Sequence, residues 1–193
     1  MGKHIAFIVI DGFADWEHAY LSSAARTYFE ATTSFHTPGG APVTSMGGMT
    51  ISPGNPIEAL EPAAYDALVV IGSALWIEDG APEVSAVLQA ADQAGKVVGA
   101  ICAGTLAVGR AGLLEGRRHT SNEAGFLDAK AQGYGAAATY VDTPRAVSDG
   151  RLVTAAGSSP VTFATAVLSA LHPSSAENLK AFEAMCAAEF AAQ

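Results

Sequence analysis

Cys102 lies where a buried strand is predicted to end and a helix to begin. The run KVVGAI before it is apolar, and AGTLAVGRAGLL after it carries a helical pattern. A helix that starts directly after Cys102 directs unpaired backbone N–H groups and the positive end of its dipole toward the sulfur. Both favour the thiolate, which is the nucleophilic form of cysteine. The alternative is a small buried hydrophobe, because free cysteines are among the most buried residue types.

Glu17 is the second candidate for chemistry. In the stretch DGFADWEHAYL, Asp15 is expected to cap a helix and Glu17 to lie in its first turn. Ligands of open parallel sheets bind beyond the carboxyl ends of the strands, so Glu17 would face Cys102 if strands 4–10 and 96–101 are neighbours. Burial and a nearby thiolate would raise the pKa of Glu17 and suit it to donate a hydrogen bond or to act as a general acid or base. The alternative is that its charge only complements the helix dipole.

A third turn, IGSALW, is expected to reach the same edge of the sheet. There the backbone N–H groups of Gly72 and Ser73 would join the Ala103 amide in an oxyanion site. Trp16 and Trp76 each follow a turn of this kind. They would form walls of a small, mostly apolar pocket, or else pack at its rim or at a subunit interface.

The remaining pattern predicts the scaffold. Three β-branched runs without alternation indicate strands covered on both faces, and helical patterns lie between them, as in a parallel sheet with right-handed crossovers. The expected strands are residues 4–10, 66–72 and 96–101, and the expected helices are residues 19–31, 82–95 and 160–171.

Two hairpins and a last helix complete the predicted elements. The hairpins are expected around Gly47–Gly48 and at Asp149–Gly150. The last helix is expected to open at Pro173–Ser174, with Ser174 and Glu177 at the spacing of a capping box. Its apolar face would consist of Leu179, Phe182, Cys186 and Phe190, which makes Cys186 a core residue.

Composition limits the function classes. The 193 residues fit one domain, 1–193, and half of them are hydrophobic. A net charge of −9 with 10 lysines and arginines argues against a nucleic-acid partner. No run suits a membrane span, the start lacks a signal cleavage site, and two cysteines suit a reducing compartment, so a cytoplasmic protein is expected. No phosphate-binding motif and no metal-ligand spacing is present, so neither a cofactor nor a metal is expected.

The three turns together resemble the ThiJ/PfpI superfamily, the single-domain relatives of class I glutamine amidotransferases. The resemblance is carried by IAFIVIDGFADWE, YDALVVIGS and GAICAGTLAVGRAGLLEGRRHTSN. It implies a flavodoxin-like, three-layer α/β sandwich with a mostly parallel central sheet, usually in a homodimer. It also implies that Cys102 sits on a nucleophile elbow and is readily oxidised to a sulfinic acid, with Glu17 as its protonated partner. The amides of Ser73 and Ala103 match the oxyanion-type site, although Ser73 replaces a common glycine and would narrow the pocket.

The sequence departs from the superfamily at the third catalytic position. Asn122 stands where some members have a histidine, and Ala103 stands where the protease-like branch has one. His119 lies three positions before Asn122, on the opposite face of an extended segment. It would reach the site only if that segment is irregular, and is otherwise expected to be a partly exposed strand residue. Peptidase and glutaminase activities are therefore not expected.

Two function classes remain open. The first is a cysteine-dependent enzyme acting on a small electrophile, a hydratase, hydrolase or glyoxalase/deglycase-like enzyme, with Cys102 as nucleophile and Glu17 as proton shuttle. The second is a redox-sensing or stress-protection protein that uses oxidation of Cys102 and has little turnover.

Overall fold

The computed structural model describes residues 2–188, and within them a six-stranded sheet has the order β2-β1-β5-β6-β8-β7. All pairs are parallel except β7 with β8 at one edge. The strands of this sheet are β1 His4–Ile8, β2 Thr32–His36, β5 Ala67–Val70, β6 Val97–Ile101, β7 Val147–Asp149 and β8 Leu152–Ala155; β3 Val43–Thr44 and β4 Thr50–Ile51 form a separate hairpin. The flavodoxin-like, mostly parallel α/β fold predicted from the sequence is thus confirmed.

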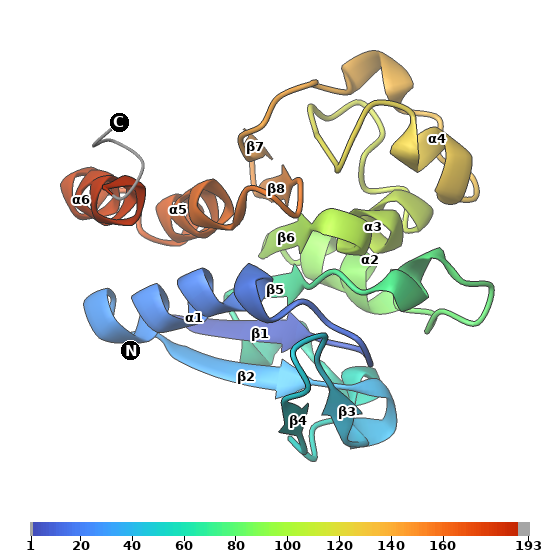
Figure 1. Cartoon of the computed structure of the whole chain (residues 1–193), viewed down its shortest axis with the longest axis horizontal. Coiled ribbons are helices and arrows are strands. Elements are labelled where there is room, and N and C mark those ends of the chain that lie inside the picture. Colours follow the sequence, from blue (N-terminus) through green and yellow to red (C-terminus); the bar gives the residue numbers. More distant parts are fainter. Residues whose placement is uncertain (1, 189–193) are drawn as a thin grey trace.

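Helices cover both faces of the sheet (Figure 1). The α-helices are α1 Asp15–Tyr28, α2 Ser85–Gln93, α3 Thr105–Arg110, α4 Phe126–Lys130, α5 Pro160–Leu171 and α6 Ala176–Ala187, and short 3₁₀ turns include η4 Ala74–Ile77 and η5 Cys102–Gly104. Helices α1, α5 and α6 lie together over one face, and α2 and α3 lie against the other. Strands β5 and β6 are buried along their whole length, which explains their uninterrupted apolar sequences.

The condition under which Glu17 was expected to face Cys102, direct pairing of the two strands before them, is not met. Strands β1 and β6 are not neighbours, because β5 pairs with both and separates them. The parallel arrangement still brings the carboxyl ends of all three strands to one edge, so the segments that follow them meet there. Figure 1 shows this edge at the arrowheads of β1, β5 and β6.

Several element boundaries also differ from the sequence prediction. Helix α1 begins at Asp15, so Glu17 lies in its first turn as expected, but Ala14 occupies the N-cap instead of Asp15. Helix α6 begins at Ala176 with no side-chain cap, so the predicted capping box is not formed. Leu179 and Phe182 are buried on this helix as predicted, and Phe190 lies outside the described residues.

The hairpins agree more closely with the prediction. Strands β3 and β4 flank Gly47–Gly48 as expected. The β7–β8 connection is Gly150–Arg151, one residue later than expected, and Gly150 takes the positive φ of 59° that such a turn favours. No helix among residues 2–188 has the length and apolar character needed to cross a bilayer.

Candidate active site

Cys102 occupies a strained elbow between β6 and α3. Its φ of +57° is in the left-handed region, which costs an ordinary residue about 1–2 kcal/mol. The Thr105 hydroxyl donates a 2.6 Å hydrogen bond to the Cys102 carbonyl oxygen and so holds the turn. The elbow also packs tightly on β5, since a methyl group at Gly104 would lie 2.7 Å from the Val70 carbonyl oxygen. Strain that the surroundings maintain in this way is typical of functional positions.

The strain gives a stability prediction. Glycine adopts this conformation without the steric cost, so Cys102→Gly should be more stable to urea than Cys102→Ala by about 1 kcal/mol. Ala107→Gly in the interior of α3 is the control, where glycine should instead destabilise by a similar amount. Equal stability of the two Cys102 variants would mean that the elbow is not strained.

The Glu17 carboxyl group and the Cys102 side chain lie together between two glycine backbones. The Gly72 N–H donates a 2.7 Å hydrogen bond to Glu17 Oε2, and Glu17 is fully buried. A methyl group at Gly72 would lie 2.6 Å from Glu17 Oε2 and 2.7 Å from Cys102 Cβ. On the other side, a methyl group at Gly157 would lie 2.8 Å from Cys102 Sγ and 3.1 Å from Glu17 Oε1. Gly72 lies just after β5, the strand between β1 and β6, and its backbone contacts both the Glu17 carboxyl group and the Cys102 side chain.

The two ionisable groups share one negative charge. Burial raises the pKa of Glu17 to about 7, and the Gly72 N–H opposes this only in part. Burial, and then the Glu17 carboxylate, raise the pKa of Cys102 to about 11, although hydrogen bonds from Asn122 and from the Ala103 amide favour the thiolate. Burial and the Glu17 charge thus outweigh the effect by which the helix terminus was expected to favour the thiolate, while the pKa of Glu17 is raised as expected. While Glu17 is ionised, the sulfur keeps its proton.

Asn122 lies beside the sulfur, at the position where some members of the superfamily that the sequence resembles have a histidine. Its side-chain Nδ2 lies 3.5 Å from Cys102 Sγ and donates to it, while its Oδ1 accepts a 3.0 Å hydrogen bond from the Gly157 N–H. An amide can donate to a thiolate but does not take up a proton at neutral pH.

Comparison with known proteins assigns the family. The model of the DJ-1/PfpI family matches residues 3–170. The chain belongs to the DJ-1/PfpI family. The resemblance to the ThiJ/PfpI superfamily predicted from the sequence is thereby confirmed.

Relatives of this DJ-1/PfpI chain match along most of its length. It is 33% identical over 179 residues to a Bacillus subtilis protein named uncharacterized protease YdeA, covering 92% of this chain and 88% of the relative. A solved DJ-1 superfamily protein from Agrobacterium tumefaciens is 39% identical, with a TM-score of 0.89 over 97% of this chain and 99% of that one. Drosophila melanogaster DJ-1beta, at 21% identity, has a TM-score of 0.70 over both full chains and shows the shared fold.

His119 does not reach the site of this DJ-1/PfpI protein. The residue is fully buried, and its ring nitrogens bond to the Arg117 carbonyl oxygen at 2.8 Å and the Tyr134 hydroxyl at 2.7 Å. The Tyr140 ring also packs edge-on against the His119 ring, with 5.8 Å between the ring centroids. Both ring nitrogens are bonded to groups other than Cys102, as expected for the opposite face of the segment, but the expectation of partial exposure is wrong because the residue is fully buried.

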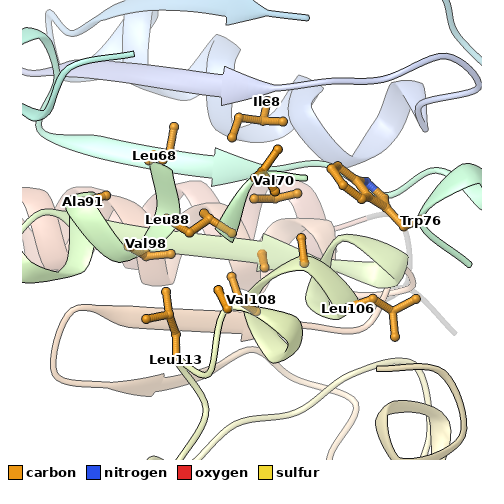
Figure 2. Close-up of a cluster of buried hydrophobic side chains, with 14 of the residues drawn as sticks. Ile8, Leu68, Val70, Trp76, Leu88, Ala91, Val98, Leu106, Val108 and Leu113 are labelled. Carbon is orange, nitrogen blue, oxygen red and sulfur yellow. The ribbon is translucent and has the colours of Figure 1, made fainter. Parts of the chain in front are cut away.

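Trp76 was predicted to lie at the wall or rim of the pocket, but it lies in the core, whereas Trp16 lies at the surface beside Gly157. Trp76 is fully buried, and its indole N–H donates to the Ile71 carbonyl oxygen at 2.9 Å. Figure 2 shows it in the core cluster that includes Val70 and Leu106, so its indole belongs to the core and is not an exposed wall beside Cys102. Trp16 is 45% exposed and donates to the Gly157 carbonyl oxygen at 3.0 Å.

Ser73 and Ala103 are both buried beside this edge. The Ala103 amide lowers the pKa of Cys102 and so favours its thiolate. The Ser73 hydroxyl donates to the Asp11 carbonyl oxygen at 2.6 Å and accepts from the Leu75 N–H at 3.2 Å, so both of its hydrogen bonds are made to neighbouring backbone groups.

The second cysteine, Cys186, lies on α6 and packs, partly buried, against the core. Within residues 2–188, no three histidine, cysteine or acidic side chains are placed to hold a metal ion together.

Proposed function

We propose that this DJ-1/PfpI protein is a cysteine-dependent enzyme that acts on small electrophiles, in hydratase, hydrolase or glyoxalase/deglycase-like chemistry. The observation that carries the proposal is the buried Glu17 carboxyl group, with its pKa near 7, beside the sulfur of the strained Cys102. A pKa near the working pH suits a group that both accepts and returns a proton.

The reaction begins with transfer of the Cys102 thiol proton to the Glu17 carboxylate. The sulfur forms a bond to the electrophilic carbon as the thiol releases this proton, and the π electron pair of the substrate moves onto its oxygen or nitrogen. The amides of Ser73 and Ala103 stabilise the developing charge, and Glu17 then returns its proton to the substrate. Water completes the cycle by replacing sulfur on the adduct, which regenerates the thiol.

Proteolysis is not part of the proposal, although curated relatives carry the word protease in their names. Peptide hydrolysis needs a base that drives acylation and a strong acid for the amine leaving group. Asn122 supplies neither next to the sulfur, and the His119 ring is bonded elsewhere. Homodimer formation and a cytoplasmic location stay predictions from the family resemblance and the sequence.

The proposal is tested by incubating the protein with aldehydes, methylglyoxal and isocyanides. We expect product formation, with a transient adduct on the Cys102 peptide in mass spectrometry that Cys102→Ser lacks and Cys186→Ser retains. Turnover that persists in Cys102→Ser would contradict the proposal. Peroxide-dependent oxidation of Cys102 without turnover of any electrophile would favour the redox-sensing alternative, in which the same donors hold the oxygens of the oxidised sulfur.

A further inference from the structure

Three consecutive residues at the start of α1 each bind a different loop. Asp15 accepts hydrogen bonds from the Ser45 hydroxyl at 2.5 Å and from the Gly47 N–H at 2.8 Å, both in the β3–β4 hairpin. Glu17 binds Gly72, as described above. Trp16, between them, donates to the carbonyl oxygen of Gly157. The backbone that carries Trp16 is therefore fixed on both sides.

The Gly157 peptide is held directly over the sulfur. Its N–H bonds to Asn122 Oδ1 at 3.0 Å and its carbonyl oxygen bonds to Trp16 Nε1 at 3.0 Å, so two side chains fix the 156–159 loop that joins β8 to α5. The space beside its Cα is already filled, because a methyl group there would be 2.8 Å from Cys102 Sγ. Gly72 closes the other side of the cysteine. A substrate therefore meets the sulfur beside a loop whose position depends on Trp16.

We infer that Trp16 is a specificity-determining residue, which selects electrophiles with an unhindered terminal carbon by holding the 156–159 loop against Cys102. The inference rests on the proposed reaction at Cys102 and adds the substrate class to it. An electrophilic carbon with two bulky substituents would have to displace the Gly157 peptide and break its hydrogen bond to the indole. A terminal carbon reaches the sulfur with the loop in place.

The indole N–H is the part of Trp16 that matters for this selection. Nearly half of the Trp16 side chain is exposed, so its ring contributes less packing than a buried tryptophan, while its N–H is used on the loop. One hydrogen bond of this kind stabilises the closed position of the loop by about 0.5–1.5 kcal/mol. Its removal should thus increase the population of the displaced loop by about three- to tenfold.

The test compares two alkylating agents that share one leaving group and differ at the reacting carbon: iodoacetamide, whose carbon is terminal, and the larger 2-iodopropanamide, whose carbon carries an added methyl group. Sulfur bonds to that carbon as iodide leaves, and the thiol proton passes to the solvent, so no other reagent is needed. In a Cys186→Ser background, the rate ratio of the large to the small reagent should rise about three- to tenfold in Trp16→Phe, which keeps a ring but lacks the N–H. Trp16→Ala should raise the ratio at least as much.

Tyr20→Phe is the matched control, because Tyr20 is an exposed aromatic residue on the same helix with no hydrogen bond to the loop. It should leave the ratio unchanged. A Trp16→Phe ratio equal to that of the wild type, with circular dichroism showing intact folding, would overturn the inference. Because the readout is thiol modification, this result is independent of turnover: size selection can fail while Cys102-dependent turnover persists, and the reverse.

Discussion

Replacing Gly157 with alanine is expected to slow the reaction of Cys102 with iodoacetamide about ten- to a hundredfold. The new methyl group would lie 2.8 Å from Cys102 Sγ and 3.1 Å from Glu17 Oε1, well inside normal contact distance. Gly157 does not have a positive φ, so alanine fits its backbone and the effect is steric. Because Trp16 and Asn122 hold the loop, the clash must push the sulfur aside, which separates the cysteine from its acid.

Gly80→Ala is the matched control for this experiment. A methyl group at Gly80 meets nothing within 4 Å, and the residue has no positive φ, so this variant should alkylate as the wild type does. Rates are measured at fixed pH in a Cys186→Ser background, so that Cys102 is the reacting thiol. If Gly157→Ala reacts at the wild-type rate and remains folded, the loop does not restrict the sulfur.

The sequence predicted the edge of the sheet at which the site forms, because this follows from strand order along the chain. Uninterrupted apolar runs predicted the buried strands, and parallel strands end at one edge. Cys102 directly follows one such strand, and Glu17 lies in the first turn of the helix that comes after another, so their meeting depended only on the edge and not on which strands are neighbours. This is why the two residues meet although β5 separates β1 from β6.

The features that the sequence did not predict depend on contacts between distant loops. The hydrogen bonds of Gly157 with Trp16 and Asn122 join positions 141 and 35 residues apart, and no local pattern encodes them. Trp76 was misplaced because an aromatic residue after a strand packs equally well below the turn or above it. The sequence shows only the nearby helix terminus, which lowers the pKa of Cys102. Burial and the Glu17 charge raise this pKa, and both arise only when the chain folds.

Replacing Glu17 with glutamine is expected to move the pH at which Cys102 becomes reactive by about two units. In the wild type the first proton leaves the pair near pH 7, because the buried Glu17 has its pKa at about 7 and can then accept the thiol proton. Glutamine keeps an oxygen for the Gly72 N–H but accepts no proton. The thiol must then ionise without this acceptor. Loss of the Glu17 charge lowers the thiol pKa from about 11, but burial still holds it above the ordinary value of 9.0, so the half-point of alkylation should rise from near 7 to above 9.0.

Asp15→Asn is the control for charge removal in the same helical turn, because the Asp15 carboxylate binds the β3–β4 hairpin rather than the sulfur. Its half-point should stay near that of the wild type. A half-point that is the same in wild type and Glu17→Gln would exclude Glu17 as the proton acceptor. The comparison is made by following iodoacetamide incorporation across the pH range in the Cys186→Ser background.

The same substitution should stabilise the fold at high pH while it impairs reactivity. The pKa of Glu17 is higher in the folded chain, about 7, than its ordinary value of 4.5, so between these pH values the folded state binds more protons than the unfolded state. The free energy of unfolding of the wild type therefore falls over this window relative to Glu17→Gln, by roughly 3 kcal/mol in total. Urea denaturation of both proteins at pH 4.5 and pH 8 measures the difference. If this difference in the free energy of unfolding does not grow between pH 4.5 and pH 8, the ionised form of Glu17 does not destabilise the folded protein, and its pKa is not raised. The site would then lack a proton acceptor with a pKa near 7, on which the proposed chemistry depends.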